Sequence, residues 1–416
     1  AKGIADLGFR VQSGKVTAAQ AIDEIASGLT GSALLALGAL LASKGLVRGG
    51  DDDDDREQSW NDLLGHQNYA LELPNGTSVT LDWLAPEAIP FFMGVNLASS
   101  VGENGWTADA VVGALRSIAD PMLEMSMLSS MNDILESKKY EEGSAVEKVV
   151  TSALVSYFSQ GVPTALGQLN RILEDKRMTT YVDKNSTVLT RGTQQLLGKL
   201  SGKIPGMDAN RIPYIDAWGQ EEETGDVLTR IVNNTLNPAY VSKVEMDGVE
   251  KELARLGKVV GSGVYPSRAA KSFAVNGDTK NLTAQEYVKY AKTLGQGKHE
   301  MLEAAFQLDG YKRLSNADKA EMITTLYQYA NEKAKRAVTS QYTMSSGAQK
   351  YADAEKAGIS PAEWYLLKNS ADADGNGRIT QKEAKAAMAQ AGLTRKEMAA
   401  VWPLFSKKWG EKNPYK

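Results

Sequence analysis

Residues 25–47 have the sequence IASGLTGSALLALGALLASKGLV, and Arg48, two glycines and the aspartates at 51–55 follow. No charged side chain occurs from Ile25 to Ser43, which is about the length needed to cross the hydrocarbon layer of a bilayer. The stretch contains small residues that permit close contact between helices, namely Gly28, Gly31, Ser32, Ala36, Gly38 and Ala39. It predicts a membrane-active helical segment or, alternatively, a helical hairpin buried in a large core.

Two further uncharged and apolar segments follow at 88–102 and 149–170, and Gly or Pro interrupts each of them. One such segment is typical of a protein core, whereas three in succession favour a helical block that enters a membrane or drives assembly. We therefore expect membrane contact or self-assembly through the apolar side chains of this block: Leu34, Leu35, Leu37, Leu40, Leu41, Phe91, Phe92, Val155 and Phe158.

The clearest β signal lies at 69–83. Apolar residues alternate with polar ones on both sides of the tight-turn sequence Pro-Asn-Gly at 74–76. This pattern predicts one β-hairpin. Because an isolated hairpin is only marginally stable, we expect it to pack on helices or to pair with another copy of the chain.

Composition excludes several classes of function. The chain has 416 residues and a formal net charge of -4, which argues against a generic nucleic-acid binder. It has no Cys, so disulfides, thiolate catalysis and Cys-ligated zinc are excluded. The length predicts about two or three domains with a sizeable core.

The sequence predicts a mainly α fold, with an apolar multi-helix N-terminal block that carries one β-hairpin and a soluble helical C-terminal region. Composition divides the chain into the apolar block at 1–175, a polar and turn-rich connector at 176–281, a soluble helical domain at 282–345 and a calcium-binding tail at 346–416.

Capping patterns predict two long helices in the soluble helical domain. Thr283 with Glu286, and Ser315 with Asp318, are typical of helix N-termini. Helical spacing indicates packing positions rather than a ligand site at Tyr287, Tyr290, Leu326, Tyr329 and Ala330.

The most specific motif is DADGNGRITQKE at 372–383, which matches the twelve-residue EF-hand loop at each diagnostic place. Gly377 supplies the sharp turn, and Ile379 is the apolar residue expected to point inward. The predicted calcium ligands are the side chains of the first three acidic or amide residues, one backbone carbonyl, a hydroxyl that acts directly or through water, and a bidentate carboxylate: Asp372, Asp374, Asn376, Arg378, Thr380 and Glu383.

Two alternatives to a complete EF-hand stay open. Thr380 and Glu383 also form a capping-box pattern, so the loop could merely cap a helix. A dockerin carries two such loops, and only one is visible, although the segment LTRKEMAAVWPLF at 393–405 could pair with it as a degenerate partner. We expect a structural rather than a sensing role, because the methionines that line sensor grooves are sparse here.

Other candidate sites fail on spacing. His299 and Glu300 lack the second His four residues on, where Glu303 stands, so no zinc-protease helix is present. GKLSGK at 198–203 has the wrong spacing for a phosphate loop, and no acidic pair is marked as a glycosidase pair. The sequence therefore predicts that the chain is not an enzyme.

Seven strings occur in order along the chain: GLTGSALLALGALLASKGLVRGG, LPNGTSVTLDWLAPEAIPFFMGV, RIPYIDAWGQ, NPAYVS, LTAQEYVKYAKTLGQGKHEMLEAAF, YKRLSNADKAEMITTLYQYANEKAK and the final KNPYK. Taken together, they resemble the C-terminal part of very large multidomain virion proteins of tailed phages and prophages of Gram-positive gut bacteria. The resemblance covers nearly the whole chain and depends mostly on the order of the blocks.

The resemblance implies a non-enzymatic internal or ejection protein that lies in the virion and, after ejection, in the host cell envelope. Its expected partners are further copies of the chain, portal and tail proteins, and a host membrane, with DNA only as passing cargo. An alternative is a static head or tail protein whose apolar helices are buried permanently, and a weaker alternative is an envelope pore-forming protein.

Overall fold

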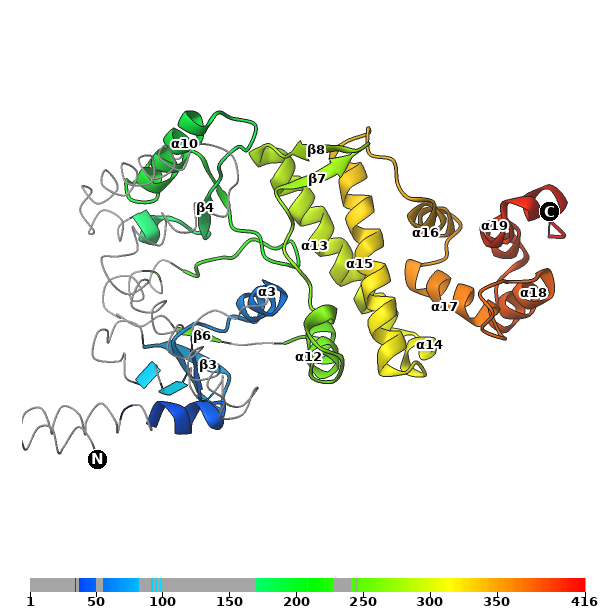
Figure 1. Cartoon of the computed structure of the whole chain (residues 1–416), viewed down its shortest axis with the longest axis horizontal. Coiled ribbons are helices and arrows are strands. Elements are labelled where there is room, and N and C mark those ends of the chain that lie inside the picture. Colours follow the sequence, from blue (N-terminus) through cyan, green and yellow to red (C-terminus); the bar gives the residue numbers. More distant parts are fainter. Residues whose placement is uncertain are drawn as a thin grey trace, which may run out of the picture. The chain divides into compact units, whose positions relative to one another are not determined.

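The computed structural model describes residues 34, 37–49, 55–81, 91–92, 94–95, 98, 170–207, 209–226, 230, 241–243 and 246–415. They form a mainly helical protein with a few small sheets, as the composition and periodicity predict (Figure 1). The described residues fall into two compact units. Unit 1 draws them from 1–52, 65–172 and 226–245, and unit 2 from 53–64, 173–225 and 246–416. The division of the chain into four regions, which was made from composition, stays a prediction.

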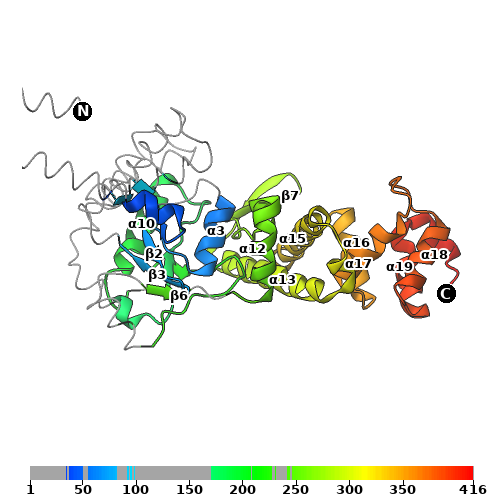
Figure 2. The ribbon, with the colours of Figure 1, turned by 90° about the horizontal axis from the view of Figure 1, so that it is seen from below.

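Unit 1 contains a four-stranded antiparallel sheet in the order β1-β2-β3-β6 (Figure 2). The predicted hairpin is present as β2 (Ala70–Glu72) and β3 (Thr77–Thr80), and Gly76 adopts the left-handed φ of 81° that the turn requires. β1 (Val47–Arg48) and β6 (Val241–Lys243) pair with its two outer edges. The hairpin is therefore stabilised by strands of its own chain rather than by helices alone.

The core of unit 1 lies beside this sheet and contains five buried residues: Val47, Tyr69, Phe91, Phe92 and Val95. The ring of Phe92 meets that of Tyr69 edge to face, with centroids 5.1 Å apart. The helical residues 37–43 approach Phe91 closely, since a Cβ atom on Gly38 would lie 2.0 Å from the carbonyl oxygen of Phe91. The small residues of the uncharged stretch thus permit close packing at this point.

The apolar side chains proposed for membrane contact or assembly occupy different environments. Phe91 and Phe92 are core residues, and Leu34 and Leu41 are partly buried against the same core. In contrast, Leu37 and Leu40 are 44% and 52% exposed. Leu35, Val155 and Phe158 lie outside the described residues.

No helix within the described part of the chain is both long and apolar enough to cross a membrane. Much of the uncharged stretch at 25–43, and nearly all of the segments at 88–102 and 149–170, lie outside the described residues.

Unit 2 contains most of the described helices. They are α3 (Asp55–Leu64), α10 (Val188–Ser201), α12 (Gly248–Val260), η4 (Ser262–Val264), α13 (Ala284–Gln307), α14 (Asp309–Lys312), α15 (Asn316–Val338), α16 (Ser346–Lys356), α17 (Pro361–Ala371), α18 (Gln381–Gln390), α19 (Arg395–Phe405) and η5 (Lys407–Lys412). Two antiparallel strand pairs accompany them, β4 (Met178–Thr180) with β5 (Arg211–Pro213) and β7 (Ser272–Val275) with β8 (Asp278–Asn281).

The long helices α13 and α15 run side by side in the centre of unit 2 (Figure 1). Their N-termini lie where the capping patterns predict them, with the backbone N–H groups of Glu286 and Asp318 donating to the hydroxyls of Thr283 and Ser315. The five predicted packing positions are all buried, which confirms the helical spacing: Tyr287, Tyr290, Leu326, Tyr329 and Ala330.

Candidate metal site in the C-terminal helix-loop-helix

Helices α16 to α19 and the tail that follows them form the C-terminal module, which we define as residues 346–415. α17 contacts α16 and α18, and α19 contacts α16, α18 and η5 (Figure 1). Apolar side chains that are fully buried hold the helices together, among them Trp364, Met388 and Trp402. Burial of two indole rings in so small a module is a large part of its hydrophobic stabilisation. The loop between α17 and α18 is thus held by helices that pack on their neighbours.

A helix flanks the loop on each side, as an EF-hand requires. α17 begins with Pro361 at its first helical position, after the N-cap residue Ser360, and it ends at Ala371. α18 begins after the N-cap residue Thr380. The segment at 393–405 that was considered as a degenerate partner of the loop forms α19, which contacts α18. The helix-loop-helix arrangement is therefore present, whereas metal binding stays a prediction.

Backbone N–H groups within the loop donate to the side chains predicted as the first three ligands. The N–H of Gly377 donates to Oδ2 of Asp372 at 3.0 Å, and the N–H of Asn376 donates to Oδ1 of Asp374 at 3.2 Å. The N–H of Arg378 donates to Oδ1 of Asn376 at 2.8 Å. Gly375 and Gly377 have φ values of 68° and 76°, which a side chain would strain. The loop is therefore curled tightly, with its acidic side chains turned back toward its own backbone.

One oxygen of Asp372 has no partner among the described residues. While Oδ2 accepts from Gly377, Oδ1 is buried and no described group donates to it. A buried carboxylate oxygen without a donor is costly, and binding an ion or a water is one way to satisfy it. This oxygen belongs to the residue at the first ligand position of the motif, so it is the strongest structural sign of a cation site in the loop.

Glu383 is turned toward the helix cap instead. Its Oε2 accepts from the N–H of Thr380 at 2.8 Å and from the hydroxyl of the same residue at 2.7 Å. In return, the N–H of Glu383 donates to the Thr380 hydroxyl, which completes a capping box. In this structure Thr380 and Glu383 therefore cap α18. The same two side chains carry the oxygens that the motif assigns as calcium ligands.

The donor set fits a hard cation. Carboxylate, amide and carbonyl oxygens are the ligands that Ca²⁺ prefers, and the loop supplies all three types. Within the described part of the chain, no three acidic or histidine side chains already converge on one point.

The two histidines are engaged in hydrogen bonds. Nε2 of His299 lies 2.7 Å from Oδ2 of Asp247, and Nδ1 of His66 lies 3.1 Å from Oε1 of Glu72. The hydroxyl of Ser78 donates to the same oxygen of Glu72 at 3.1 Å.

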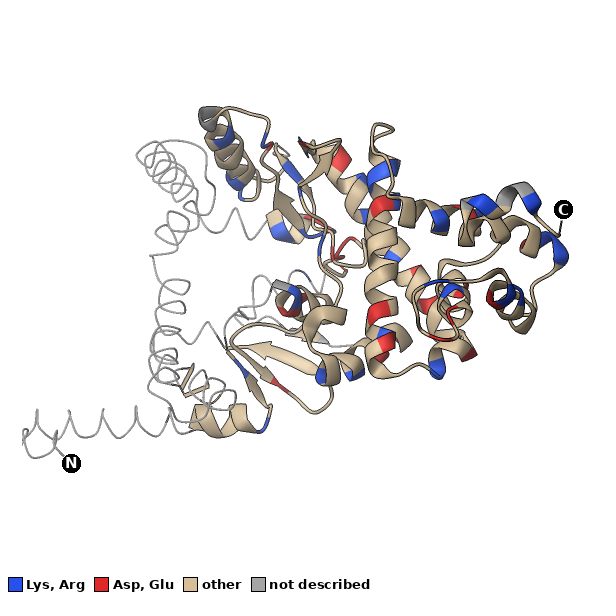
Figure 3. Cartoon of the chain, turned by 45° about the vertical axis from the view of Figure 1, so that its right-hand side comes forward, with Lys and Arg blue, Asp and Glu red and all other residues tan. Residues whose placement is uncertain are grey.

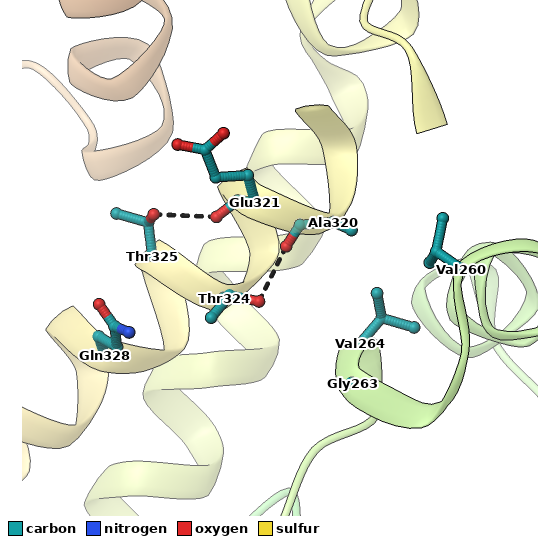
Figure 4. A pocket seen from close by; sticks show the side chains of 8 residues that line it. All are labelled: Val260, Gly263, Val264, Ala320, Glu321, Thr324, Thr325 and Gln328. Atoms are coloured by element: carbon teal, nitrogen blue, oxygen red, sulfur yellow. Dashed lines mark hydrogen bonds between the residues drawn. The ribbon is translucent and has the colours of Figure 1, made fainter. Parts of the chain in front are cut away.

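A shallow pocket of about 370 Å³ lies between η4 and α15 (Figure 4). Val260 and Val264 form one wall of it, and α15 forms the other. The hydroxyls of Thr324 and Thr325 donate to the carbonyls of Ala320 and Glu321, both at 2.9 Å, so they are not free for a ligand. The other polar side chains that line the pocket are those of Glu321 and Gln328 on α15.

Comparisons with protein-family models, with curated proteins and with solved structures found no match to this chain.

Proposed function

We propose that the chain is a non-enzymatic structural protein whose α17-loop-α18 arrangement binds one Ca²⁺ ion. The observation that carries this proposal is the buried and unpartnered Oδ1 of Asp372, at the first position of a loop whose sequence fits an EF-hand. The ligands would be side-chain oxygens of the first three residues, a backbone carbonyl, a hydroxyl and a bidentate carboxylate: Asp372, Asp374, Asn376, Arg378, Thr380 and Glu383.

A bound Ca²⁺ supplies positive charge where the loop gathers carboxylates. Asp372 is the C-cap residue of α17, and Glu383 lies in the first turn of α18. One ion bound by both side chains would therefore tie the two helices together. The cost is the pair of hydrogen bonds that Glu383 now accepts from Thr380. Since the loop connects packed helices, this chemistry favours a structural role over a sensing role.

Thermal unfolding in the presence and absence of calcium tests the proposal. A ligand that binds only the folded state stabilises it by about 2.7 kcal/mol at a hundred times its Kd, so calcium should raise the unfolding temperature of the module. Glu383→Gln should abolish the rise, because Gln retains the capping box but cannot chelate with two carboxylate oxygens.

Glu397→Gln is the matched control. Glu397 occupies the same position in the capping box of α19, where Thr394 is the N-cap residue and no acidic loop precedes it. This variant should keep the full calcium response. Loss of the response in both variants would show that the response does not depend on coordination by Glu383.

For the wider role, we propose an internal or ejection-type virion protein that assembles with copies of itself and with portal or tail proteins. Support comes from the sequence resemblance and from the uncharged segments of the N-terminal block. The exposure of Leu37 and Leu40 on one helix, at 44% and 52%, is consistent with an assembly surface.

The static head or tail protein is the second candidate, and one observation favours it. Phe91 and Phe92 are covered by unit 1 itself, so these two rings need no membrane and no partner to be buried. A static protein would keep them in this core throughout.

Flotation with vesicles of neutral lipid separates the two candidates. The ejection role predicts that the full chain floats and that Leu37→Gln with Leu40→Gln reduces flotation. The control replaces Leu173 and Val259, which are 67% and 61% exposed in unit 2, by Gln. Absence of flotation at every pH and calcium concentration would favour the static role.

A further inference from the structure

The last part of the chain is basic in a protein that is acidic overall. Residues 381–416 contain eight Lys or Arg and three Glu, while the whole chain has a net charge of -4. Six of these cations are exposed in the structure, and we call them the basic face: Lys382, Lys385, Arg395, Lys396, Lys408 and Lys412. Figure 3 shows Lys and Arg gathered at the C-terminal end of the chain.

Among the side chains that the structure describes, the cations of the basic face form no salt bridge. Earlier in unit 2, lysines pair repeatedly with carboxylates, as Lys176 and Lys292 do with Glu221. The two described carboxylates nearest in sequence, Glu383 and Glu397, accept hydrogen bonds from the caps of α18 and α19 instead. Within the described residues, the positive charge of the basic face is therefore not neutralised by these carboxylates.

Contacts around Trp402 bring the basic face together from three separate segments. Nζ of Lys385 lies 5.8 Å from the centre of the Trp402 ring, on which Trp409 and Tyr415 of the tail also pack at 4.9 and 5.7 Å. Nε of Arg395 in turn donates to the carbonyl oxygen of Tyr415 at 3.3 Å. The first half of α18, the start of α19 and the tail thus meet around Trp402.

Two of these cations break a local rule of helix stability. Arg395 and Lys396 occupy the first two positions of α19, where the helix dipole is positive and acidic residues are favoured. Glu397 offsets part of this repulsion. Departures from local rules of this kind occur in proteins at functional positions.

The aromatic residues beside the basic face indicate the kind of anionic partner. Phe405, Trp409 and Tyr415 are half-buried and flanked by Lys in the sequence, which is typical of residues that lie at the headgroup level of a membrane. Their rings pack on each other and on Trp402, so they do not form an open platform on which nucleic-acid bases could stack.

We propose that the basic face docks the C-terminal module onto a lipid surface that carries anionic phosphate headgroups. Lys and Arg side chains near such a surface each contribute to attraction, which falls off within the Debye length. This inference does not depend on calcium binding by the loop, nor on insertion of the N-terminal apolar segments.

The test is co-sedimentation of the full chain with vesicles of phosphatidylcholine alone or mixed with phosphatidylglycerol, in a calcium chelator. Binding should be stronger to the anionic vesicles, and the excess should vanish at an ionic strength of about 1 M, where the Debye length is about 3 Å. Any binding that is equal for both vesicles reports the apolar N-terminal segments instead.

The decisive variant replaces Lys382, Lys396, Lys408 and Lys412 by Gln, since all four side chains are exposed. We expect the excess binding to fall by on the order of a hundredfold or more. The control replaces four other exposed lysines of unit 2 by Gln and should bind as the wild type does: Lys251, Lys258, Lys289 and Lys368.

Three results would overturn the proposal. One is equal binding to neutral and anionic vesicles by the wild-type chain, and another is an equal loss in the two four-site variants. The third is retention of duplex DNA by the wild-type chain without any excess binding to anionic vesicles. Circular dichroism of both variants confirms that each is folded when it is compared.

Discussion

The indole ring of Trp60 stacks on the phenol ring of Tyr265, with ring centroids 4.7 Å apart and planes 2° from parallel. Trp60 lies on α3, and Tyr265 follows η4 some two hundred residues later in the sequence. Arg56 strengthens the contact by donating to the carbonyl oxygen of Gly263 at 2.6 Å, and Arg268 forms a salt bridge with Asp62. α3 is consequently a part of unit 2, although the strands on either side of it in the sequence belong to unit 1.

Trp60→Ala should destabilise unit 2 by about 3–5 kcal/mol, because it removes a buried indole ring and leaves a cavity against Tyr265. Trp60→Phe keeps an aromatic ring for stacking and should cost clearly less. Urea unfolding followed by circular dichroism measures both. Equal stability of the Ala variant and the wild type would mean that α3 does not contribute to unit 2.

Two glycines of α13 should respond oppositely to the same substitution. A Cβ atom on Gly295 would lie 2.0 Å from the backbone nitrogen of Gly219, so Gly295→Ala must push the turn at 216–219 off the helix, at about 1–3 kcal/mol. On Gly297 the nearest atom would be the Cβ of Ala330 at 3.9 Å, so Gly297→Ala should stabilise the helix by about 1 kcal/mol. Thermal unfolding of the two variants checks the signs, and destabilisation by both would contradict this account.

Lys298 should make stability depend on alkaline pH. Burial, with a smaller effect from the charge of Arg56, lowers its pKa from the ordinary 10.5 to about 8, and its Nζ donates to the carbonyl oxygen of Ser267 at 2.8 Å. Between about pH 8 and 10 the unfolded chain then holds a proton that the folded chain has lost, so stability rises with pH by up to about 1.4 kcal/mol per unit.

Lys298→Met should remove this rise, and Lys289→Met, at an exposed position of the same helix, should retain it. The measurement is the free energy of unfolding in urea as a function of pH. The measurement is best kept below about pH 10, because burial raises the pKa of Tyr290 from 10.0 to about 12. Above about pH 10 the unfolded chain loses this tyrosine proton before the folded chain does, so stability falls as pH rises. An unchanged slope in Lys298→Met would show that Lys298 is not the titrating group.

Short sequence patterns predicted the helix starts and the turn that depend on only a few neighbouring residues. The capping residues Thr283 and Ser315 and the turn at Gly76 fix backbone conformation within a few residues, and each lies where it was expected. The loop at 372–383 lies between two helices, as the EF-hand motif requires.

Two further local signals lie in the polar, turn-rich connector at 176–281. Asn276 and Gly277 have φ values of 53° and 96° and connect β7 to β8, as the Asn-Gly dipeptide between alternating residues indicates. Asp247 and Glu250 form a complete capping box that starts α12. Both elements were predictable from the sequence.

Long-range contacts could not be predicted from any single stretch. The membership of α3 in unit 2 depends on Tyr265, and the pairing of β6 with β3 joins Val241 to Val79 across the sequence. The orphan oxygen of Asp372 likewise depends on how α17 and α18 pack around the loop. The motif gave the candidate ligands. Only the structure shows that Asp372 leaves one oxygen without a donor while Glu383 is turned toward Thr380.

Calorimetric titration of the full chain with calcium tests the central claim most directly. The account predicts one binding event per chain for the wild type and for Glu397→Gln, and none for Glu383→Gln or Asp372→Asn. Magnesium should bind much more weakly, because it requires a smaller and near-octahedral set of ligands. No heat of binding for the wild type, or equal binding by Glu383→Gln, would contradict the account and leave the loop as a helix cap.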